Sequence, residues 1–187
     1  MSERSRKACS LQLEREFLTG SSCSLTLTGA FCAHIGGEGF AVTSHSASAS
    51  TTGPFYVLNG TFTLFRDVDA SYEATVRVAY STLGNNQFNE YPMKVPRKRF
   101  CDMLVDEYVD YQFIWANRTS LPYVARGTRE FCPFPKGEYW VRELTPDAGF
   151  IPPVVPSGLW RMTVEFWQDD ELVVQGRFYY RVMKGLI

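Results

Sequence analysis

The C-terminal stretch 159-LWRMTVEFWQDDELVVQGRFYYRVM-183 is the clearest indication of the fold, because apolar and polar residues alternate on both sides of a short turn. The apolar face is formed by Trp160, Met162, Val164 and Phe166 before the turn, and by Leu172, Val174, Phe178, Tyr180 and Val182 after it. A period of two is typical of a β-strand with one buried face. The turn formers in 168-QDDE-171 then predict an antiparallel hairpin.

The same alternation recurs in 56-YVLNGTFTLF-65, in 72-YEATVRVAY-80 and, with apolar residues on both faces, in 138-EYWVREL-144. In 100–117 the apolar residues instead recur every three to four positions, which is helical spacing. One-sided strands with short turns favour antiparallel pairing. The sequence therefore predicts an all-β sandwich of two antiparallel sheets, with one short helix at about residues 100–115 and a domain spanning 55–187.

Residues 1–54 have a different character. The first 16 residues are highly charged and lack the apolar core of a secretory signal, so the literal reading is a cytoplasmic protein. The segment 41-AVTSHSASASTTGP-54 is rich in Ser, Thr and Ala, which predicts a linker. Residues 23–31 could supply one strand. We interpret 1–54 as an N-terminal extension, either an atypical leader or an incorrectly assigned start.

Charge and hydropathy narrow the range of partners. The formal net charge of -1 gives no electrostatic reason to expect nucleic acid. No run of about 20 apolar residues occurs, so we expect no transmembrane segment.

Catalytic chemistry has little support. Both histidines, His34 and His45, precede residue 55, so the predicted domain lacks the usual base for a Ser or Cys nucleophile and the usual ligand for zinc. We expect no enzymatic activity, no metal and no cofactor. Paired carboxylates are the remaining route to an enzyme, and they occur in predicted turns or on the helix surface. These pairs are Asp67 with Asp69, Asp106 with Glu107, and Asp169 with Asp170.

Five cysteines are divided between the two parts of the chain. Cys101 and Cys132 lie in the predicted domain, and they are either a disulfide or two buried thiols. The others, Cys9, Cys23 and Cys32, lie in the extension, and the sequence leaves their state open.

Two N-glycosylation acceptors, Asn59-Gly60-Thr61 and Asn117-Arg118-Thr119, fall on a polar strand face and at the helix end. A disulfide together with glycosylation would indicate a secreted protein, in spite of the N-terminus.

Aromatic residues make up 15% of the chain, and most of them lie in the predicted domain. They either fill the core or, if the sheets separate at one edge, line a cavity for an apolar ligand.

The order of several motifs resembles a known family. The succession begins with NGTFTLFRDVD, YEATVRVAY and FCDML, and continues with FCPFPKGEYWVREL and PPVVPSGLWRMTVEF. It resembles secreted insect proteins of unknown function grouped with the ML domain, the lipid-recognition family, and more distantly the chemosensory CheB proteins and the ganglioside activator. The most specific residues are Phe100, Cys101, Cys132, Pro133, Gly137, Tyr139, Pro156, Gly158, Trp160 and Arg161.

The resemblance implies an immunoglobulin-like β-sandwich, a Cys101–Cys132 bridge, and a secreted, non-enzymatic binder or carrier of a lipid or other small hydrophobic molecule between two sheets. It implies a lipid-recognition or chemosensory context. Combined with the alternation, it predicts that the ligand contacts Leu58, Phe62, Leu64, Val76, Val78, Trp140, Val164, Phe166, Phe178 and Tyr180.

A second interpretation is an accessory module with a filled core that binds a receptor protein. It would act through the proline-rich loop 151-IPPVVPSG-158 and the neighbouring Trp160. A tightly packed core with an exposed aromatic patch would favour this interpretation.

Overall fold

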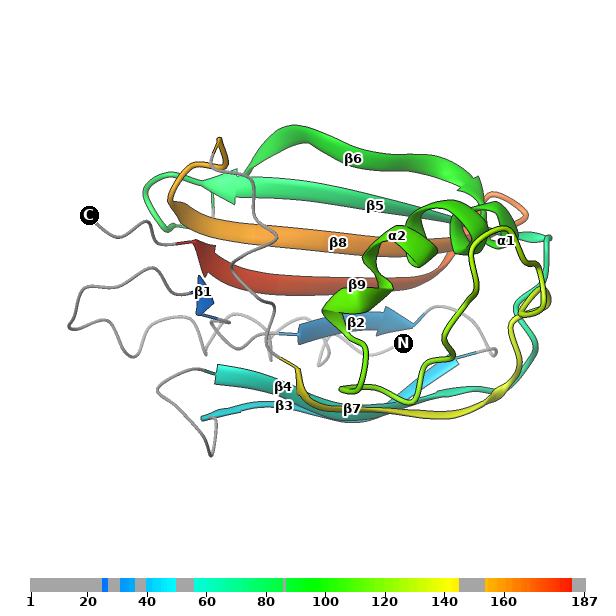
Figure 1. Cartoon of the computed structure of the whole chain (residues 1–187). Helices are drawn as coiled ribbons and strands as arrows, with labels where there is room; N and C mark the ends of the chain where they lie inside the picture. Colours follow the sequence, from blue (N-terminus) through cyan, green and yellow to red (C-terminus); the bar gives the residue numbers. More distant parts are fainter. Residues whose placement is uncertain are drawn as a thin grey trace, which may run out of the picture.

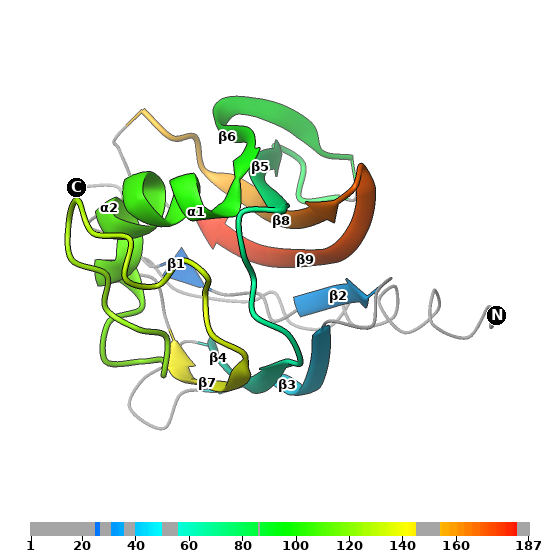
Figure 2. The same cartoon turned by 90° about the vertical axis from the view of Figure 1, so that its right-hand side faces the viewer.

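The computed structural model describes residues 25–26, 31–35, 40–49, 56–85, 87–144 and 154–182. These residues form two antiparallel sheets that lie as two layers, with one helical segment beside them (Figures 1 and 2). Sheet A has the strand order β1-β9-β8-β5-β6, with β2 also paired to β9, and sheet B has the order β3-β4-β7. The predicted all-β sandwich of two antiparallel sheets is confirmed.

The strands are β1 (Leu25–Thr26), β2 (Phe31–Ile35), β3 (Phe40–Ala49), β4 (Tyr56–Leu64), β5 (Tyr72–Ser81), β6 (Asn89–Arg99), β7 (Gly137–Leu144), β8 (Gly158–Gln168) and β9 (Glu171–Val182).

Strands β8 and β9 form the predicted hairpin. Trp160 lies opposite Tyr180, and Val164 lies opposite Gly176. The turn consists of Asp169 and Asp170, whose φ angles are 50° and 62°. Two successive residues with positive φ match the right-handed twist of the flanking strands, and Asp tolerates this conformation better than most residues.

Strand β5 is central in sheet A, because it pairs with β8 on one side and with β6 on the other. The β5–β6 register shifts twice, between Ala74 and Val76 and between Arg77 and Ala79. Such bulges bend a strand and increase its twist. Strand β6 accordingly follows a curved path along the edge of sheet A (Figure 1).

Gly158 begins β8 at a position where the chains approach closely. Its φ is 147°, and a Cβ atom there would lie 2.9 Å from the carbonyl oxygen of Ser81. A side chain would therefore push apart the ends of β5 and β8. This contact explains why glycine stands two residues before Trp160.

The N-terminal part of the chain differs from the expectation. Residues 41–49, expected as a linker, belong to β3, which pairs with β4 from Phe40 opposite Leu64 to Ala49 opposite Tyr56. Strands β1 and β2 both pair with β9, where the sequence indicated one strand at most. Ladder hydrogen bonds join backbone groups, so a Ser/Ala/Thr-rich segment can pair when a neighbouring strand is available. Cys9 and Cys23 lie outside the described residues.

The helical segment occupies Phe100–Ile114, close to the predicted range. It comprises α1 (Phe100–Met103), a π-helical turn η2 (Leu104–Tyr108), α2 (Val109–Tyr111) and a 3-10 turn η3 (Gln112–Ile114). A π turn contains more residues than an α turn, so it rotates every later position about the axis. Consequently the polar residue Gln112 is buried, whereas Tyr111, one of the large side chains of 100–117, is exposed.

Among the described residues, two apolar clusters stabilise the sandwich. The helix-side cluster joins both sheets to the helical segment, and the Trp160 cluster joins strands of sheet A to the loop before β8. The helix-side cluster contains Leu64, Val68, Tyr72, Leu104, Phe134 and Tyr139. The Trp160 cluster contains Val78, Val155, Trp160 and Val182, with Tyr80, Tyr91, Met162 and Tyr180 packed against it.

Cys101 and Cys132 lie at disulfide distance, with their Cα atoms 5.6 Å apart. The pair links the start of the helical segment to the loop before β7. With a sequence separation of 31, the chain-entropy model gives such a link about 3–4 kcal/mol. The prediction of a disulfide pair is supported.

Candidate functional site

The inner face of sheet A is the side of the sheet that carries Tyr72 and Trp160. Tyr72 packs with Leu64 and Tyr139 of sheet B, so this face is directed at the other layer. Cross-strand partners share a face, and three rows therefore follow one another across β5, β8 and β9 beyond Ala74. These rows are Val76–Val164–Gly176, Val78–Met162–Phe178 and Tyr80–Trp160–Tyr180.

The row Val76–Val164–Gly176 has the smallest side chains of the three. We call it the middle row, because it lies between Phe166 and Met162 along β8. Val76 and Val164 are only half-buried although they belong to central strands, and Gly176 contributes no side chain. Larger side chains flank the row, with Phe166 on one side and Phe178 on the other. An apolar, half-buried strip with small residues at its centre is the kind of surface that accommodates an apolar ligand.

The Trp160 row forms one end of this strip. The Trp160 ring is fully buried, stacks on Tyr80 with centroids 5.2 Å apart, and lies 6.4 Å from Tyr180. Tyr91 of β6 meets the same ring edge-on at 4.9 Å. The indole Nε1 donates to the Pro156 carbonyl at 3.0 Å. Burial raises the pKa of Tyr180 to about 12.

Sheet B contributes some of the predicted ligand contacts. Leu64 is buried in the helix-side cluster, and Phe62 stacks on Tyr139 with centroids 5.3 Å apart. Leu58 is half-buried and lies opposite Leu144.

Trp140 lies apart from the other predicted contacts. Its neighbour Tyr139 packs inward, and successive side chains of a strand point to opposite faces, so Trp140 is on the outer side of sheet B. There the Arg142 guanidinium lies 4.5 Å from its ring centroid. Residues 138–144 carry apolar side chains on both faces of the strand. Alternation alone therefore could not show whether Tyr139 or Trp140 faces the other sheet.

The sequence had not singled out Tyr80, Tyr91, Trp160 and Met162 as ligand contacts, although all four border the strip. For Tyr80, Trp160 and Met162 the signal was available, since each alternates in step with a predicted contact residue on its own strand. Tyr91 was missed because no strand was predicted over Asn89–Arg99, which forms β6.

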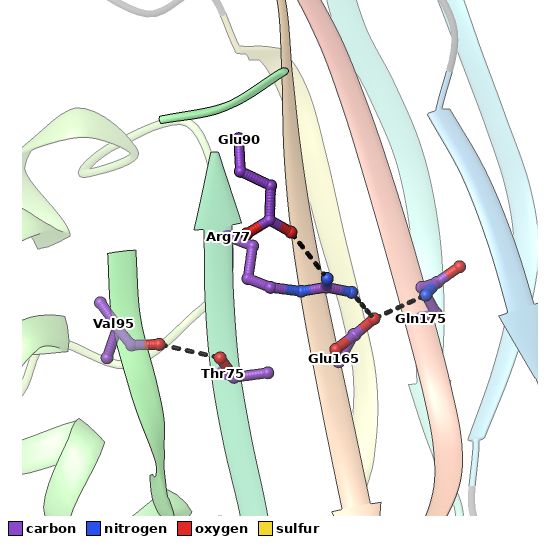
Figure 3. Close-up of polar contacts among 6 residues, drawn as sticks. All are labelled: Thr75, Arg77, Glu90, Val95, Glu165 and Gln175. Carbon is purple, nitrogen blue, oxygen red and sulfur yellow. Dashed lines mark hydrogen bonds and ion pairs between the residues drawn. The ribbon is translucent and has the colours of Figure 1, made fainter. Parts of the chain in front are cut away.

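The outer face of sheet A is polar (Figure 3). Arg77 lies between two carboxylates, Glu165 at 2.6 Å and Glu90 at 3.1 Å, and Gln175 donates to the same Glu165 oxygen at 2.7 Å. The hydrogen bond to Glu165 is the main cause that raises the pKa of Arg77. At the edge, the Thr75 hydroxyl donates to the Val95 carbonyl at 2.8 Å.

A small open pocket adjoins this network, with a volume of about 50 Å³. Its lining includes Arg77, Glu90, Arg161, Thr163, Gln175 and Arg177. Room for a few water-sized groups is far too little for a lipid chain. This pocket is therefore distinct from the predicted ligand site on the inner face.

The candidate carboxylate pairs make contacts of a structural kind. Asp106 and Glu107 both pair with Lys98, at 3.0 and 2.7 Å. Asp69 accepts hydrogen bonds from Ser71, which lower the pKa of its carboxyl. Among the described residues, no group of three His, Cys, Asp or Glu side chains is placed to hold a metal ion.

The two glycosylation acceptors differ in exposure. Asn117 is exposed, at the end of the helical segment. Asn59 is half-buried in β4, and its Oδ1 accepts a hydrogen bond from the Glu143 backbone at 2.8 Å.

In the part of the chain that the structure describes, no helix has both the length and the apolar character needed to cross a membrane. Comparison of the chain with protein-family models and with curated protein sequences gave no match.

Proposed function

We propose that this protein is a non-enzymatic binder or carrier of a lipid or another small hydrophobic molecule, held against the inner face of sheet A. The middle row carries this proposal. Val76 and Val164 are half-buried at the centre of the sheet, beside the two packed clusters. The resemblance to the ML domain points to the same region.

Apolar burial would provide the binding free energy. Covering half-buried valine, phenylalanine and tyrosine side chains contributes roughly 25 cal/mol per Å² of apolar surface removed from water, before ordering costs. The Trp160 row would give one end of the ligand a rigid aromatic wall.

Secretion is part of the proposal. The Cys101–Cys132 pair and the exposed acceptor Asn117 suit an oxidising compartment with glycosylation. Asn59 is the less accessible acceptor, because its side chain is already engaged with the Glu143 backbone. The chemosensory or lipid-recognition context is supported by the family resemblance alone.

The receptor-binding alternative has less support, because it relied on contact through Trp160. Trp160 is fully buried, so it is not available to a partner, whereas Val154 in the preceding loop is 75% exposed. Exposed aromatic side chains do occur elsewhere, at Tyr111, Phe113 and Tyr123 around the end of the helical segment. They keep the alternative open to test.

The test uses protein made in a secreting cell, examined by native mass spectrometry and by uptake of a fluorescent fatty acid. We expect a bound apolar molecule and saturable uptake. Val164→Phe would fill the middle row and reduce fatty-acid affinity by about tenfold or more. The matched control Val154→Phe makes the same change at an exposed position and should bind as the wild type does.

A wild-type protein that carries no apolar molecule and takes up no fatty acid would contradict the proposal. Binding that is lost equally in both variants would also contradict it, because the site would then not be at the middle row.

A further inference from the structure

We propose a second site, for an oxyanion group, in the pocket on the outer face of sheet A. Carboxylate, sulfate and phosphate share the chemistry concerned: negatively charged oxygens that accept hydrogen bonds from guanidinium groups. This site is independent of the hydrophobe site, because it lies on the opposite face of the sheet.

The strand register builds the pocket. Arg77, Thr163 and Arg177 are direct cross-strand neighbours on β5, β8 and β9. Ala79 and Arg161 form the next pair on the same face. The small side chains of Ala79 and Thr163 are buried and form the floor, whereas the longer arginines form the walls.

The arginines differ in their partners. Arg77 engages both Glu165 and Glu90, so the carboxylates at the pocket are committed to it. Among the described residues, neither Arg161 nor Arg177 has a carboxylate within ion-pair distance. Two guanidinium groups thus border the pocket without a counter-charge from that part of the chain.

Arg161 is also held in place. Its guanidinium carbon lies 4.5 Å from the centroid of the Phe88 ring, which fixes its plane. Its Nε is buried and has no hydrogen-bond acceptor within the described part of the chain. Buried donors are almost always paired in proteins, so the guanidinium of Arg161 is under-satisfied where it borders the pocket.

The size and chemistry of the pocket define the ligand. A volume of about 50 Å³ matches one oxyanion group rather than a sugar ring or an acyl chain. Guanidinium groups bind such oxygens through paired N–H donors, with more geometric specificity than an ammonium group gives.

The test follows the arginine Nε–H signals of ¹⁵N-labelled protein by NMR, during titration with sodium sulfate, sodium phosphate or sodium acetate. Sodium chloride keeps the ionic strength constant. We expect saturable shifts of the Arg161 signal with at least one of these anions. The acetate arm distinguishes a planar carboxylate site from a tetrahedral sulfate or phosphate site.

Arg177→Gln, at an exposed position, should weaken the interaction by about tenfold. The matched control Arg126→Gln removes an exposed arginine that pairs with Asp110, away from the pocket, and should leave the titration unchanged. Shifts that rise linearly at all arginines, or saturation that is unaffected by Arg177→Gln, would overturn the proposal. Uptake of fatty acid should be the same in Arg177→Gln and wild type, which separates the two sites.

Discussion

At its centre, sheet A has two faces that differ in the reverse of the usual way. On the outer face, Thr75, Thr163 and Glu165 are polar, yet each is at least 93% buried, since their exposed fractions are 7%, 6% and 4%. On the inner face, Val76 and Val164 are apolar and only half-buried. Polar groups tolerate burial when neighbours satisfy them, whereas apolar groups lose stabilising free energy when they stay wet. The comparison indicates that the outer face is a hydrogen-bonded layer around Arg77 and Glu165 that is open at the pocket beside Arg161 and Arg177, whereas the inner face keeps partly exposed apolar area at the middle row.

The largest effect expected concerns the Trp160 row. Trp160→Ala should lower the free energy of unfolding by about 3–5 kcal/mol, because it removes a fully buried ring from between Tyr80 and Tyr180. Trp140→Ala should cost clearly less, since that ring is half-buried on the outer side of sheet B. Urea unfolding followed by circular dichroism measures both. Equal losses would show that the two tryptophans are not differently packed.

The outer face can be tested at Glu165. Glu165→Ala should cost about 2–3 kcal/mol, a value below that of a fully buried pair because the Arg77 side chain is 44% exposed. Glu90→Ala removes the other carboxylate bound to Arg77, at 65% exposure, and should cost about 0–1 kcal/mol. Chemical unfolding of the two variants gives the comparison. If Glu90→Ala costs as much as Glu165→Ala, burial of the network is not what stabilises the outer face.

A smaller effect is expected from the ionisation of Tyr180. Its folded-state pKa of about 12 lies above that of an unfolded tyrosine, so the folded state retains the proton over the pH range between the two values. Below about pH 10 Tyr180 is protonated in both states, and its contribution to the free energy of unfolding is fully present. As the pH rises from about 10 toward 12, the unfolded state ionises first and the free energy of unfolding decreases. Between about pH 9 and pH 11 the loss should be about 1 kcal/mol.

Tyr180→Phe provides the control for this prediction, because it keeps the ring and removes the ionising hydroxyl. Urea unfolding at both pH values should give a smaller loss in the variant. The same pH dependence in variant and wild type would mean that Tyr180 is not a protected hydroxyl, and that the inner face is wetter than its burial indicates.

Much of sheet A could be predicted from sequence, because apolar residues alternate cleanly along β5, β8 and β9 and the two-residue turn is marked by Asp169 and Asp170. Strand β3 could not, since its composition resembles that of a linker and its pairing with β4 depends on a neighbour far outside the local pattern. The helix was predictable, but not the burial of Gln112, because the π turn before it changes the periodicity.

The candidate sites were predictable to different degrees. Val76 and Val164 follow from alternation, which places them on the apolar face. Alternation does not predict how far the two side chains are exposed, because exposure depends on cross-strand neighbours such as Gly176, which lies opposite Val164. The Arg77–Glu165 network could not be anticipated either, since it joins strands whose register no sequence pattern specifies.

A last consequence concerns the edge of sheet B. The Ser120 amide donates to the Trp140 carbonyl at 3.1 Å, and the Arg142 amide donates to the Arg118 carbonyl at 2.8 Å. Residues 118–120, which precede β7 in the chain, therefore occupy part of the edge where a strand from another molecule would add. Exposed strand edges are common starting points for aggregation. Covering this edge therefore lowers the chance that two copies of the protein join through sheet B.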